Sequence, residues 1–356
     1  MNITYKLLSS LTIGVLVVSC GGGSASDGGL GANPSVFPAG LPEALPMECN
    51  TGSGSDIYVS NTGDDNTGDG SQGNPYATIT HVLTNVAVDG DTVQLTAGTY
   101  DSGSGESFPL FMEGPGNEDN NIPLLTGISI VGDLTAANQG ARFVINSGGS
   151  NTLRATQCAL ITGLTFENNN GNSIIVPPEY NVEINSNTFD TVASGVAINE
   201  TSAEDSGVPP SVTYIINNVF IDNLTAVKAG SSIMARDNDF MSAAGVGVRV
   251  TFNKVLFDPG KYAMGLGKRF ADLGGGSLGS WGGNSFCNGS SDFIALDATP
   301  SGQFHELIAK DNYWTGVSAV NEPSQSQFDY DTENANIQRV LTTTVTTGNS
   351  LGDGCS

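Results

Sequence analysis

A three-residue motif, in which asparagine is followed two positions later by phenylalanine or tryptophan, recurs along the chain and constrains its fold more than any other feature. It occurs as Asn187-Thr-Phe189, Asn218-Val-Phe220, Asn238-Asp-Phe240, Asn284-Ser-Phe286 and Asn312-Tyr-Trp314, at spacings of 31, 20, 46 and 28 residues. The segment Gly163-Leu-Thr-Phe166 is a variant of the same unit. Repeats of about 20–50 residues are typical of solenoids, whose coils bury their apolar faces only by stacking on one another.

The asparagines of this motif are named the corner asparagines: Asn187, Asn218, Asn238, Asn284 and Asn312. Asparagine tolerates the left-handed backbone conformation that a sharp corner needs, so we expect the corner asparagines themselves to adopt it. We also expect their side chains to hydrogen-bond from one coil to the next. The aromatic residue that follows each of them should then point into the core.

The composition agrees with many short strands joined by tight turns. Hydrophobic residues make up 38% of the 356 residues and 47 residues are glycine, which suits such strands better than a helical bundle. The motif and the composition together predict an all-β fold, a right-handed parallel β-helix over residues 56–316. A β-sandwich is the alternative fold.

Both ends of this solenoid are predicted to carry caps, because an open sheet edge has to be covered. Near the N-terminal end, strands are predicted at Ile57–Ser60 and Thr92–Leu95. Between these strands, helical spacing of apolar residues predicts a short capping helix at Ile79, Val82, Leu83 and Val86. At the other end, the polar residues 317–356 are predicted to form a C-terminal cap, with a strand at Val340–Val345.

Two segments resemble bacterial proteins of the pectin-lyase-like superfamily. The first begins at Tyr58 with Y-V-S-x-T-G-D-D, continues with G-N-P-Y-A-T-I and ends at Tyr100 with G-D-T-V-Q-L-x-A-G-T-Y. The second is Asp272-Leu-Gly-Gly-Gly-Ser-Leu-Gly-Ser-Trp-Gly-Gly-Asn-Ser-Phe286. Both are most similar to an exported subgroup known only as a domain of unknown function. The resemblance implies a parallel β-helix and indicates almost nothing about activity.

The first twenty residues predict export and lipidation. Lys6 precedes a 12-residue apolar run from Leu7 to Val18, which is typical of a signal peptide (residues 1–19) and too short to span a bilayer. The run leads into Val-Val-Ser-Cys, which resembles a lipobox, so Cys20 is the expected lipid anchor to the membrane. Gly21 follows instead of Asp, which resembles the pattern for transfer to the bacterial outer membrane, on either its periplasmic or its external face. Residues 20–55, rich in Gly, Ser and Pro, are predicted to be the anchor and its tether. The alternative is ordinary cleavage beside a chance cysteine.

The charge balance is strongly acidic, with 12 basic and 36 acidic residues and a formal net charge of −24. Nucleic acid is therefore not an expected partner, because phosphate binding needs clustered Lys and Arg. The densest group of acids, Asp64, Asp65 and Asp69, resembles the first half of a calcium-binding loop, although Tyr76 stands where such a loop has its bidentate Glu. The sequence requires no cofactor; calcium at these three residues is the candidate, and a solvated turn is the alternative.

Four cysteines follow the predicted anchor: Cys49, Cys158, Cys287 and Cys355. An even number in an oxidising compartment predicts two disulfides, for which three pairings exist. We favour Cys287 with Cys355, because the end of the chain can fold back on the last coils, and then Cys49 with Cys158. Free buried thiols are the alternative.

Two basic residues, Lys228 and Arg249, lie ten and eleven residues after the corner asparagines Asn218 and Asn238. We therefore expect them to be near neighbours on successive coils, up to one position out of register. Such a pair could hold a sugar carboxylate or supply the base of a lyase. The uronate lyases of the resembled superfamily use Lys or Arg together with calcium. The alternative is a pair of solvated side chains.

These features favour a lipid-anchored cell-envelope module without catalytic activity, which binds a polysaccharide or serves adhesion or structure. The alternative is an enzyme, either a polysaccharide lyase acting by calcium-assisted β-elimination or a glycoside hydrolase. A hydrolase would need convergent carboxylates, whereas the acids of this chain lie mostly in turn sequences. An exposed row formed by Trp281, Tyr214 and Tyr180 would indicate sugar stacking under either hypothesis.

Overall fold

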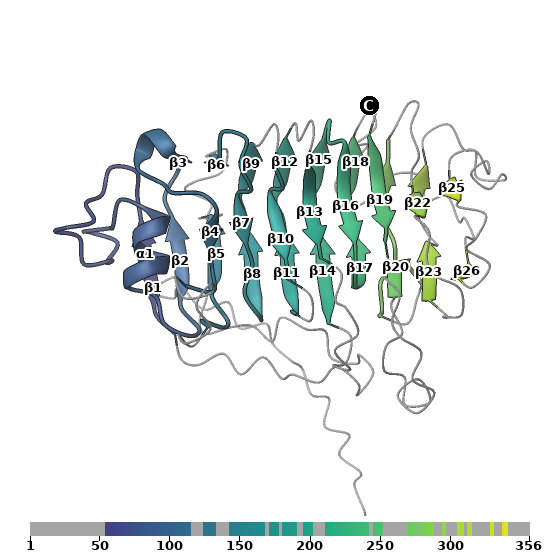
Figure 1. The fold of residues 1–356 in the computed structure, drawn as a ribbon, viewed down its shortest axis with the longest axis horizontal. Helices are drawn as coiled ribbons and strands as arrows, with labels where there is room; N and C mark the ends of the chain where they lie inside the picture. Colours follow the sequence, from purple (N-terminus) through teal and green to yellow (C-terminus); the bar gives the residue numbers. More distant parts are fainter. Residues whose placement is uncertain are drawn as a thin grey trace, which may run out of the picture. The chain divides into compact units, whose positions relative to one another are not determined.

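The computed structural model describes residues 54–114, 124–132, 142–167, 171–177, 180–190, 195–201, 211–241, 245–251, 270–275, 278–287, 294–296, 305–309, 312–314, 328–330 and 337–340. These residues form a parallel β-helix built of three sheets (Figure 1). The predicted all-β, right-handed parallel β-helix is confirmed. The predicted signal peptide, Cys20, Cys49 and Cys355 lie outside the described residues.

Hydrogen bonding between coils defines the order of the strands in each sheet. Sheet 1 has the order β1 (Asp56–Val59), β2 (Thr92–Leu95), β5 (Ser129–Gly132), β8 (Ala159–Thr162), β11 (Val182–Asn185), β14 (Val212–Ile216), β17 (Ser232–Arg236), β20 (Phe270–Gly274), β23 (His305–Ala309) and β26 (Ile337–Val340). Sheet 2 has the order β3 (Gly98–Asp101), β6 (Phe143–Asn146), β9 (Thr165–Glu167), β12 (Thr188–Asp190), β15 (Val219–Ile221), β18 (Asp239–Met241), β21 (Ser285–Phe286) and β24 (Tyr313–Trp314). Sheet 3 has the order β4 (Leu110–Phe111), β7 (Leu153–Arg154), β10 (Ile174–Val176), β13 (Val196–Glu200), β16 (Thr225–Ala229), β19 (Val246–Val250), β22 (Ile294–Leu296) and β25 (Phe328–Tyr330).

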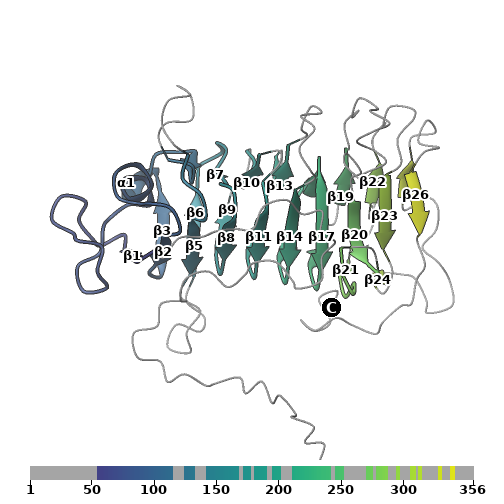
Figure 2. The same ribbon diagram turned by 90° about the horizontal axis from the view of Figure 1, so that it is seen from below.

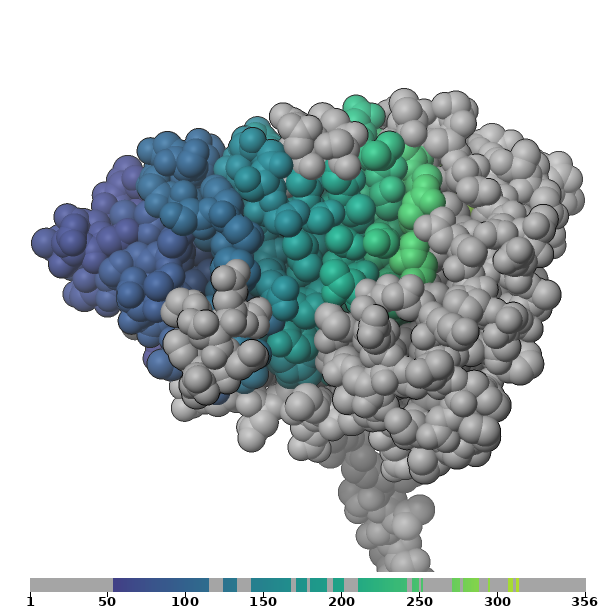
Figure 3. All heavy atoms as spheres, in the orientation of Figure 1, coloured from purple at the N-terminus to yellow at the C-terminus, as the bar shows by residue number. Residues whose placement is uncertain are grey.

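From β2 to β25, each coil passes once through sheet 1, sheet 2 and sheet 3 in that order. Strands β11, β12 and β13 form one coil, for example, and β14, β15 and β16 form the next. Figure 2 shows β5, β8, β11, β14 and β17 of sheet 1 side by side. In Figure 3 the successive coils follow one another as adjacent bands of colour from purple to green. The coils therefore stack one strand spacing apart, about 4.8 Å.

The corner between sheets 1 and 2 carries a continuous ladder of asparagine side chains. The backbone N and the Nδ2 of Asn187 both donate to Oδ1 of Asn218, and the same pair of bonds joins Asn218 to Asn238, Asn238 to Asn284 and Asn284 to Asn312. All five side chains are buried. The predicted coil-to-coil hydrogen bonding of the corner asparagines is confirmed.

The backbone conformation predicted for the corner asparagines is wrong. The left-handed conformation belongs instead to the residue that precedes four of the five: Ser186 (φ 57°), Asn217 (φ 54°), Asp237 (φ 55°) and Gly283 (φ 74°). Gly163 (φ 73°) plays the same part before Leu164, whose N–H donates to Oδ1 of Asn187 at 3.0 Å. The sharp bend one residue earlier turns each amide inward, where its oxygen and nitrogen can bond to both neighbouring coils.

The aromatic residues of the repeat form one stack along the interior. The rings of Phe166, Phe189, Phe220, Phe240 and Phe286 lie parallel, with centroid separations of 5.1, 4.9, 4.9 and 4.7 Å. All five are buried, as predicted for the repeat. The stack follows from the register, because each ring is the strand partner of the next across sheet 2.

The N-terminal end of the solenoid is covered by the predicted helix, α1 (Ile79–Asn85). Its N-cap Thr78 accepts a hydrogen bond from the backbone N of His81, and Ile79, Val82 and Leu83 are buried. The carboxylate of Glu106 accepts from the backbone N of Ile79 at 2.7 Å, which joins the helix to the segment after β3 and the short 3-10 turn Ser102–Ser104. None of the helices among the described residues has the length and apolar character needed to cross a bilayer.

Parallel pairing continues past residue 316 into the segment predicted as a C-terminal cap. Strand β25 pairs with β22, and β26 pairs with β23 from His305↔Ile337 to Ile308↔Val340. Of the strand predicted at Val340–Val345, only Val340 falls within the described residues.

Candidate ligand-binding face

The outward surface of sheet 3 brings together the two basic residues singled out from the sequence. Lys228 and Arg249 are direct Cα partners on β16 and β19, with no offset in register. The preceding residues Val227 and Val248 are fully buried, so strand alternation directs Lys228 and Arg249 outward, where both are half-buried. The expected neighbourhood is therefore present, and the role of the pair in binding stays a prediction.

The same register line extends across earlier coils. Arg154 of β7 pairs with Ile175 of β10, Ile175 with Asn199 of β13, and Asn199 with Lys228. We call this line of outward side chains, Arg154, Ile175, Asn199, Lys228 and Arg249, the basic stripe. It spans four strand spacings, about 19 Å along the stack. Three of the 12 Lys and Arg residues of an acidic chain thus lie on one line without an acidic residue among them.

Arg154 and Asn199 were not recognised as site residues from the sequence. Arg154 lies 95 residues before Arg249 and is brought into line only by the registers of four successive coils. Oδ1 of Asn199, which is buried, has no hydrogen-bond partner among the described residues, and its strand partner is Lys228. The only sequence signal for either residue is its distance from the corner, and the unequal coil lengths obscure that distance.

An ion pair occupies the N-terminal end of the basic stripe. Nε of Arg154 lies 3.1 Å from Oε2 of Glu113, whose side chain is fully buried, while that of Arg154 is 35% exposed. A buried carboxylate needs such a partner to offset its loss of hydration. Arg154 is therefore already engaged with Glu113 at this end of the stripe.

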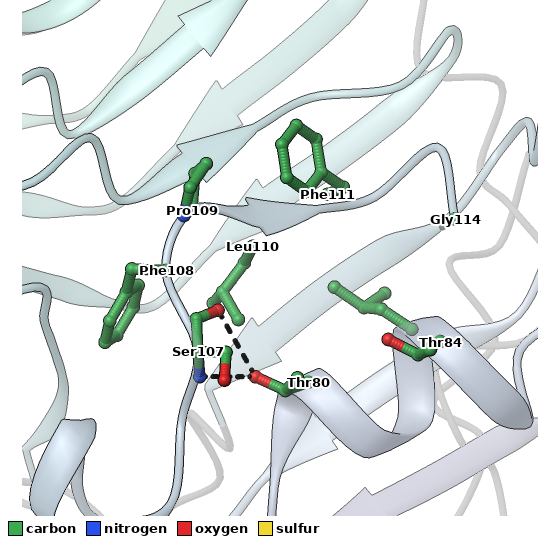
Figure 4. A pocket seen from close by; sticks show the side chains of 9 residues that line it. Thr80, Thr84, Ser107, Phe108, Pro109, Leu110, Phe111 and Gly114 are labelled. Carbon is green, nitrogen blue, oxygen red and sulfur yellow. Dashed lines mark hydrogen bonds between the residues drawn. The ribbon is translucent and has the colours of Figure 1, made fainter. Parts of the chain in front are cut away.

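A pocket of about 330 Å³ adjoins this end of the stripe (Figure 4). It lies between α1 and the segment from Ser107 to Phe111, and Phe111 is the strand partner of Arg154. Its lining is mostly apolar, and the hydroxyl of Thr80 is already engaged with Ser107 (Figure 4) and with the carboxylate of Glu106. Phe111 thus lines the pocket and lies beside Arg154, the first residue of the basic stripe.

The acidic loop is held by its own hydrogen bonds, and calcium binding at Asp64, Asp65 and Asp69 stays a prediction. Oδ1 of Asp64 accepts from the backbone N of Asn66 at 2.7 Å, and Oδ1 of Asp69 accepts from that of Ser71 at 3.0 Å. Asp65 accepts from the backbone N of Ala77 and from the hydroxyl of Thr78, the N-cap of α1. Asp64 and Asp69 therefore hold their own turns and Asp65 holds the start of α1, and no three acidic, histidine or cysteine side chains of the described residues are arranged to hold a metal.

These turn contacts act on the acidity of the loop. Hydrogen bonds from the backbone N–H groups of Asn66 and Thr67 lower the pKa of Asp64. Hydrogen bonds from Ser71 lower the pKa of Asp69, and its side chain contributes more than its backbone N–H. Both shifts are explained by the loop's own donors, which agrees with the alternative of a solvated turn.

Two of the four cysteines lie within the described residues. Cys158 and Cys287 are both disulfide-bonded. Cys158 precedes β8 and Cys287 follows β21, four coils further along the stack, so they are too far apart to bond to each other. Their partners therefore lie outside the described residues, and the pairings Cys49–Cys158 and Cys287–Cys355 stay predictions.

The three aromatic residues considered for sugar stacking do not form a row. Tyr214 is fully buried on the outer side of sheet 1, under Leu278, and burial raises the pKa of its phenol well above the ordinary value. Tyr180 is half-buried against the core. Trp281 is 57% exposed and is the only one of the three with a largely accessible ring.

The chain is similar to a described protein family and to a solved structure. The profile of the family described as "Protein of unknown function (DUF1565)" matches residues 61–318. A solved structure described as "Rhamnogalacturonan lyase" is similar with a TM-score of 0.41 and 12% sequence identity, over 74% of this chain and 70% of that chain. No curated protein sequence matches the chain.

Proposed function

The chain belongs to the family described as Protein of unknown function (DUF1565), and we propose that this member is a lipid-anchored cell-envelope module that binds an extended acidic polysaccharide along its basic stripe. The observation that carries the proposal is the direct pairing of Lys228 with Arg249 on the outward face of sheet 3. Cations placed opposite each other on neighbouring strands repel one another. A carboxylate bound between them would remove that repulsion.

The spacing of the stripe supports a polymeric ligand. Its members recur on five successive strands of sheet 3, from β7 to β19, about 4.8 Å apart and perpendicular to the strands. That interval is close to the length of one sugar unit in an extended glycan. Ile175 and Asn199 add an apolar contact and an amide to the same line, which suits a ligand with C–H faces and hydroxyl groups as well as carboxylates.

The rest of the chain restricts the ligand. A net charge of −24 repels polyanions at long range, so binding depends on contact with the stripe and on screening by salt or calcium. Anchoring through Cys20 and residues 20–55 would hold the module at the cell envelope, where acidic polysaccharides occur. Lipidation, the outer-membrane location and the polysaccharide ligand are all parts of this proposal.

Binding to polygalacturonate and alginate, measured by isothermal titration calorimetry with calcium and with a chelator, tests the proposal. We expect Lys228→Ala and Arg249→Ala each to weaken binding about ten-fold, since each removes one charge-assisted contact. The matched control is Arg142→Ala, which removes the same charge from an exposed ion pair with Glu167 on another face. Equal loss in all three variants, or no binding to either polymer, would contradict the proposal.

Catalysis by the same pair is the second candidate function, favoured by the absence of an offset between Lys228 and Arg249. In β-elimination a neutral base removes the proton beside the uronate carboxylate, and the electron pair forms a double bond as the glycosidic oxygen leaves with a proton. Arg249 would neutralise the carboxylate and Lys228 would act as the base. Release of unsaturated, ultraviolet-absorbing oligosaccharides that is lost in Lys228→Ala would establish this activity. Binding without such products supports the module.

A further inference from the structure

The corner between sheets 1 and 2 presents one exposed aromatic ring on a loop of fixed shape. The loop joins β20 to β21, and its described residues are 275 and 278–284. Trp281 lies in it and is 57% exposed, although most large apolar side chains of the described residues are buried. Holding an indole in water in this way forgoes the free energy of burying it, so the loop calls for an explanation.

A buried carboxylate holds this loop. Asp272, which is 1% exposed, accepts from the backbone N of Gly274 at 3.1 Å, of Leu278 at 2.9 Å and of Ser280 at 3.2 Å. The hydroxyl of Ser280 in turn donates to the carbonyl of Ala235 at 2.7 Å. The side chain of Leu278 is buried in an apolar cluster on the outer face of sheet 1. After Trp281, the carbonyl of Gly282 accepts from the backbone N of Asp237 at 3.1 Å, so the loop is bound to the solenoid on both sides of Trp281.

The orientation of Trp281 is also fixed. Its Nε1–H donates to Oδ1 of Asp237 at 3.1 Å, and the guanidinium carbon of Arg236 lies 3.8 Å from the centroid of its ring. Position 283 requires glycine. Its backbone is left-handed (φ 74°), and a Cβ there would come within 2.3 Å of the same Asp237 oxygen. One face of the indole and its N–H edge are thus occupied, and the exposed area belongs largely to the opposite face.

From this geometry we infer that Trp281 is a stacking platform for a pyranose ring of a neutral glycan. A pyranose presents a patch of C–H groups of about the size of an indole, which fits the open face of Trp281, while Arg236 packs on the opposite face and the buried Asp237 holds the N–H edge. The platform is pre-organised, so a sugar that stacks on it loses little protein conformational entropy.

An isolated ring with a polar rim favours a sugar over a bilayer or a protein partner. Three other large apolar side chains are exposed among the described residues. They lie in other loops, at Val88, Leu124 and Leu224. A membrane or protein contact normally needs a contiguous apolar patch, whereas one sugar ring needs one aromatic face. The adjoining charges of Arg236 and Asp237 offset each other, which suits an uncharged ligand.

This site is separate from the basic stripe. Trp281 belongs to the corner between sheets 1 and 2, and the stripe occupies the outward face of sheet 3. The two sites would take ligands of different charge, so either one can fail without the other. A polysaccharide with acidic and neutral segments could engage both.

Titration of the full-length protein with cellohexaose, mannohexaose and xylohexaose tests the platform. Tryptophan fluorescence reports on stacking, and saturation-transfer NMR on the sugar identifies the protons that contact the protein. We expect at least one hexasaccharide to bind, and Trp281→Ala to weaken that binding about ten-fold or more. Trp281→Phe should retain part of the affinity and serves as the variant that preserves an aromatic face. Arg142→Ala, which removes an exposed charge from another part of the solenoid, should leave the affinity unchanged.

The matched control is Leu224→Ala, which removes another exposed apolar side chain, 51% exposed, on a different element. Thermal unfolding of each variant shows whether it is folded; if Trp281→Ala is not, Trp281→Phe and Arg236→Gln decide, since both should weaken binding. The inference is overturned if no hexasaccharide binds, if affinity is unchanged in every Trp281 and Arg236 variant, or if Leu224→Ala weakens binding equally. Trp281-dependent binding to phosphatidylcholine vesicles instead of sugars would also overturn it.

Discussion

Replacing Asn218 by alanine tests how much the corner ladder contributes to stability. The Asn218 side chain is fully buried and makes four hydrogen bonds. It accepts from N and Nδ2 of Asn187 at 3.0 and 3.1 Å, and it donates to the carbonyl of Ile184 at 2.9 Å and to Oδ1 of Asn238 at 3.1 Å. Asn218→Ala therefore removes the side-chain partner of two buried backbone groups, the N–H of Asn187 and the C=O of Ile184.

Each buried polar group left unsatisfied costs about 1–3 kcal/mol, so Asn218→Ala should lower the free energy of unfolding by about 2–6 kcal/mol. The other two bonds cost less, because Nδ2 of Asn187 keeps the carbonyl of Ile161 and Oδ1 of Asn238 keeps the backbone N of Asn218. The matched control is Asn185→Ala, whose half-buried side chain points outward and whose loss should cost less than about 0.5 kcal/mol.

Urea unfolding followed by circular dichroism measures the two variants, and hydrogen exchange of the Asn187 amide locates the effect. We expect exchange at Asn187 to accelerate in Asn218→Ala and to stay slow in Asn185→Ala. If the two variants unfold within about 0.5 kcal/mol of each other, the ladder does not stabilise the corner and the reasoning is refuted.

Four further predictions concern the core, the acid–base behaviour and the covalent chemistry of the chain. Phe220→Ala, at the centre of the aromatic stack, should lower the free energy of unfolding by about 3–5 kcal/mol in urea titrations, and a loss below about 1 kcal/mol would show that the stack is dispensable. Burial raises the pKa of Tyr100 to about 12, so the folded state keeps a proton that the unfolded state releases near pH 10, and stability should fall as the pH rises between these values; Tyr100→Phe should show a smaller fall in alkaline thermal scans. Metabolic labelling with palmitate should fail in Cys20→Ala, and retained label would exclude Cys20 as the anchor. Peptide mapping without reduction should recover Cys287–Cys355 and Cys49–Cys158, and any other pairing contradicts the predicted connectivity.

The repeat was predictable because the same side-chain contacts recur on successive coils. Asparagine at the corner and phenylalanine two residues later recur wherever a side chain must bond upward and downward or stack on its neighbour. The left-handed residue before the corner was not predictable from the repeat, since it is a different residue type in each of four coils: Gly163, Ser186, Asn217 and Asp237. What these positions share is a backbone angle, which several small or polar residues can adopt.

The candidate sites were predicted only in part, for two physical reasons. Register across sheet 3 depends on the lengths of the turns, and the 20- to 46-residue spacings of the corners hide it, so Arg154 and Asn199 went unrecognised beside Lys228 and Arg249. The acids of the Asp64–Asp69 loop have the spacing of cation ligands, but the same spacing serves carboxylates that cap neighbouring backbone N–H groups. In the structure these carboxylates accept hydrogen bonds from neighbouring backbone donors, which the sequence pattern alone does not show, and calcium binding stays a prediction.

The direction of the hydrogen bonds between coils has a mechanical consequence. They run along the axis of the stack, and β1 and β26 stand at opposite ends of sheet 1. A pull on the chain at β1 would load the bonds to β2 first and leave those of the next coil unloaded until β1 had come away. The solenoid should therefore yield to tension by unwinding coil by coil at low force. A module tethered at its first strand would therefore lengthen under load, one coil at a time.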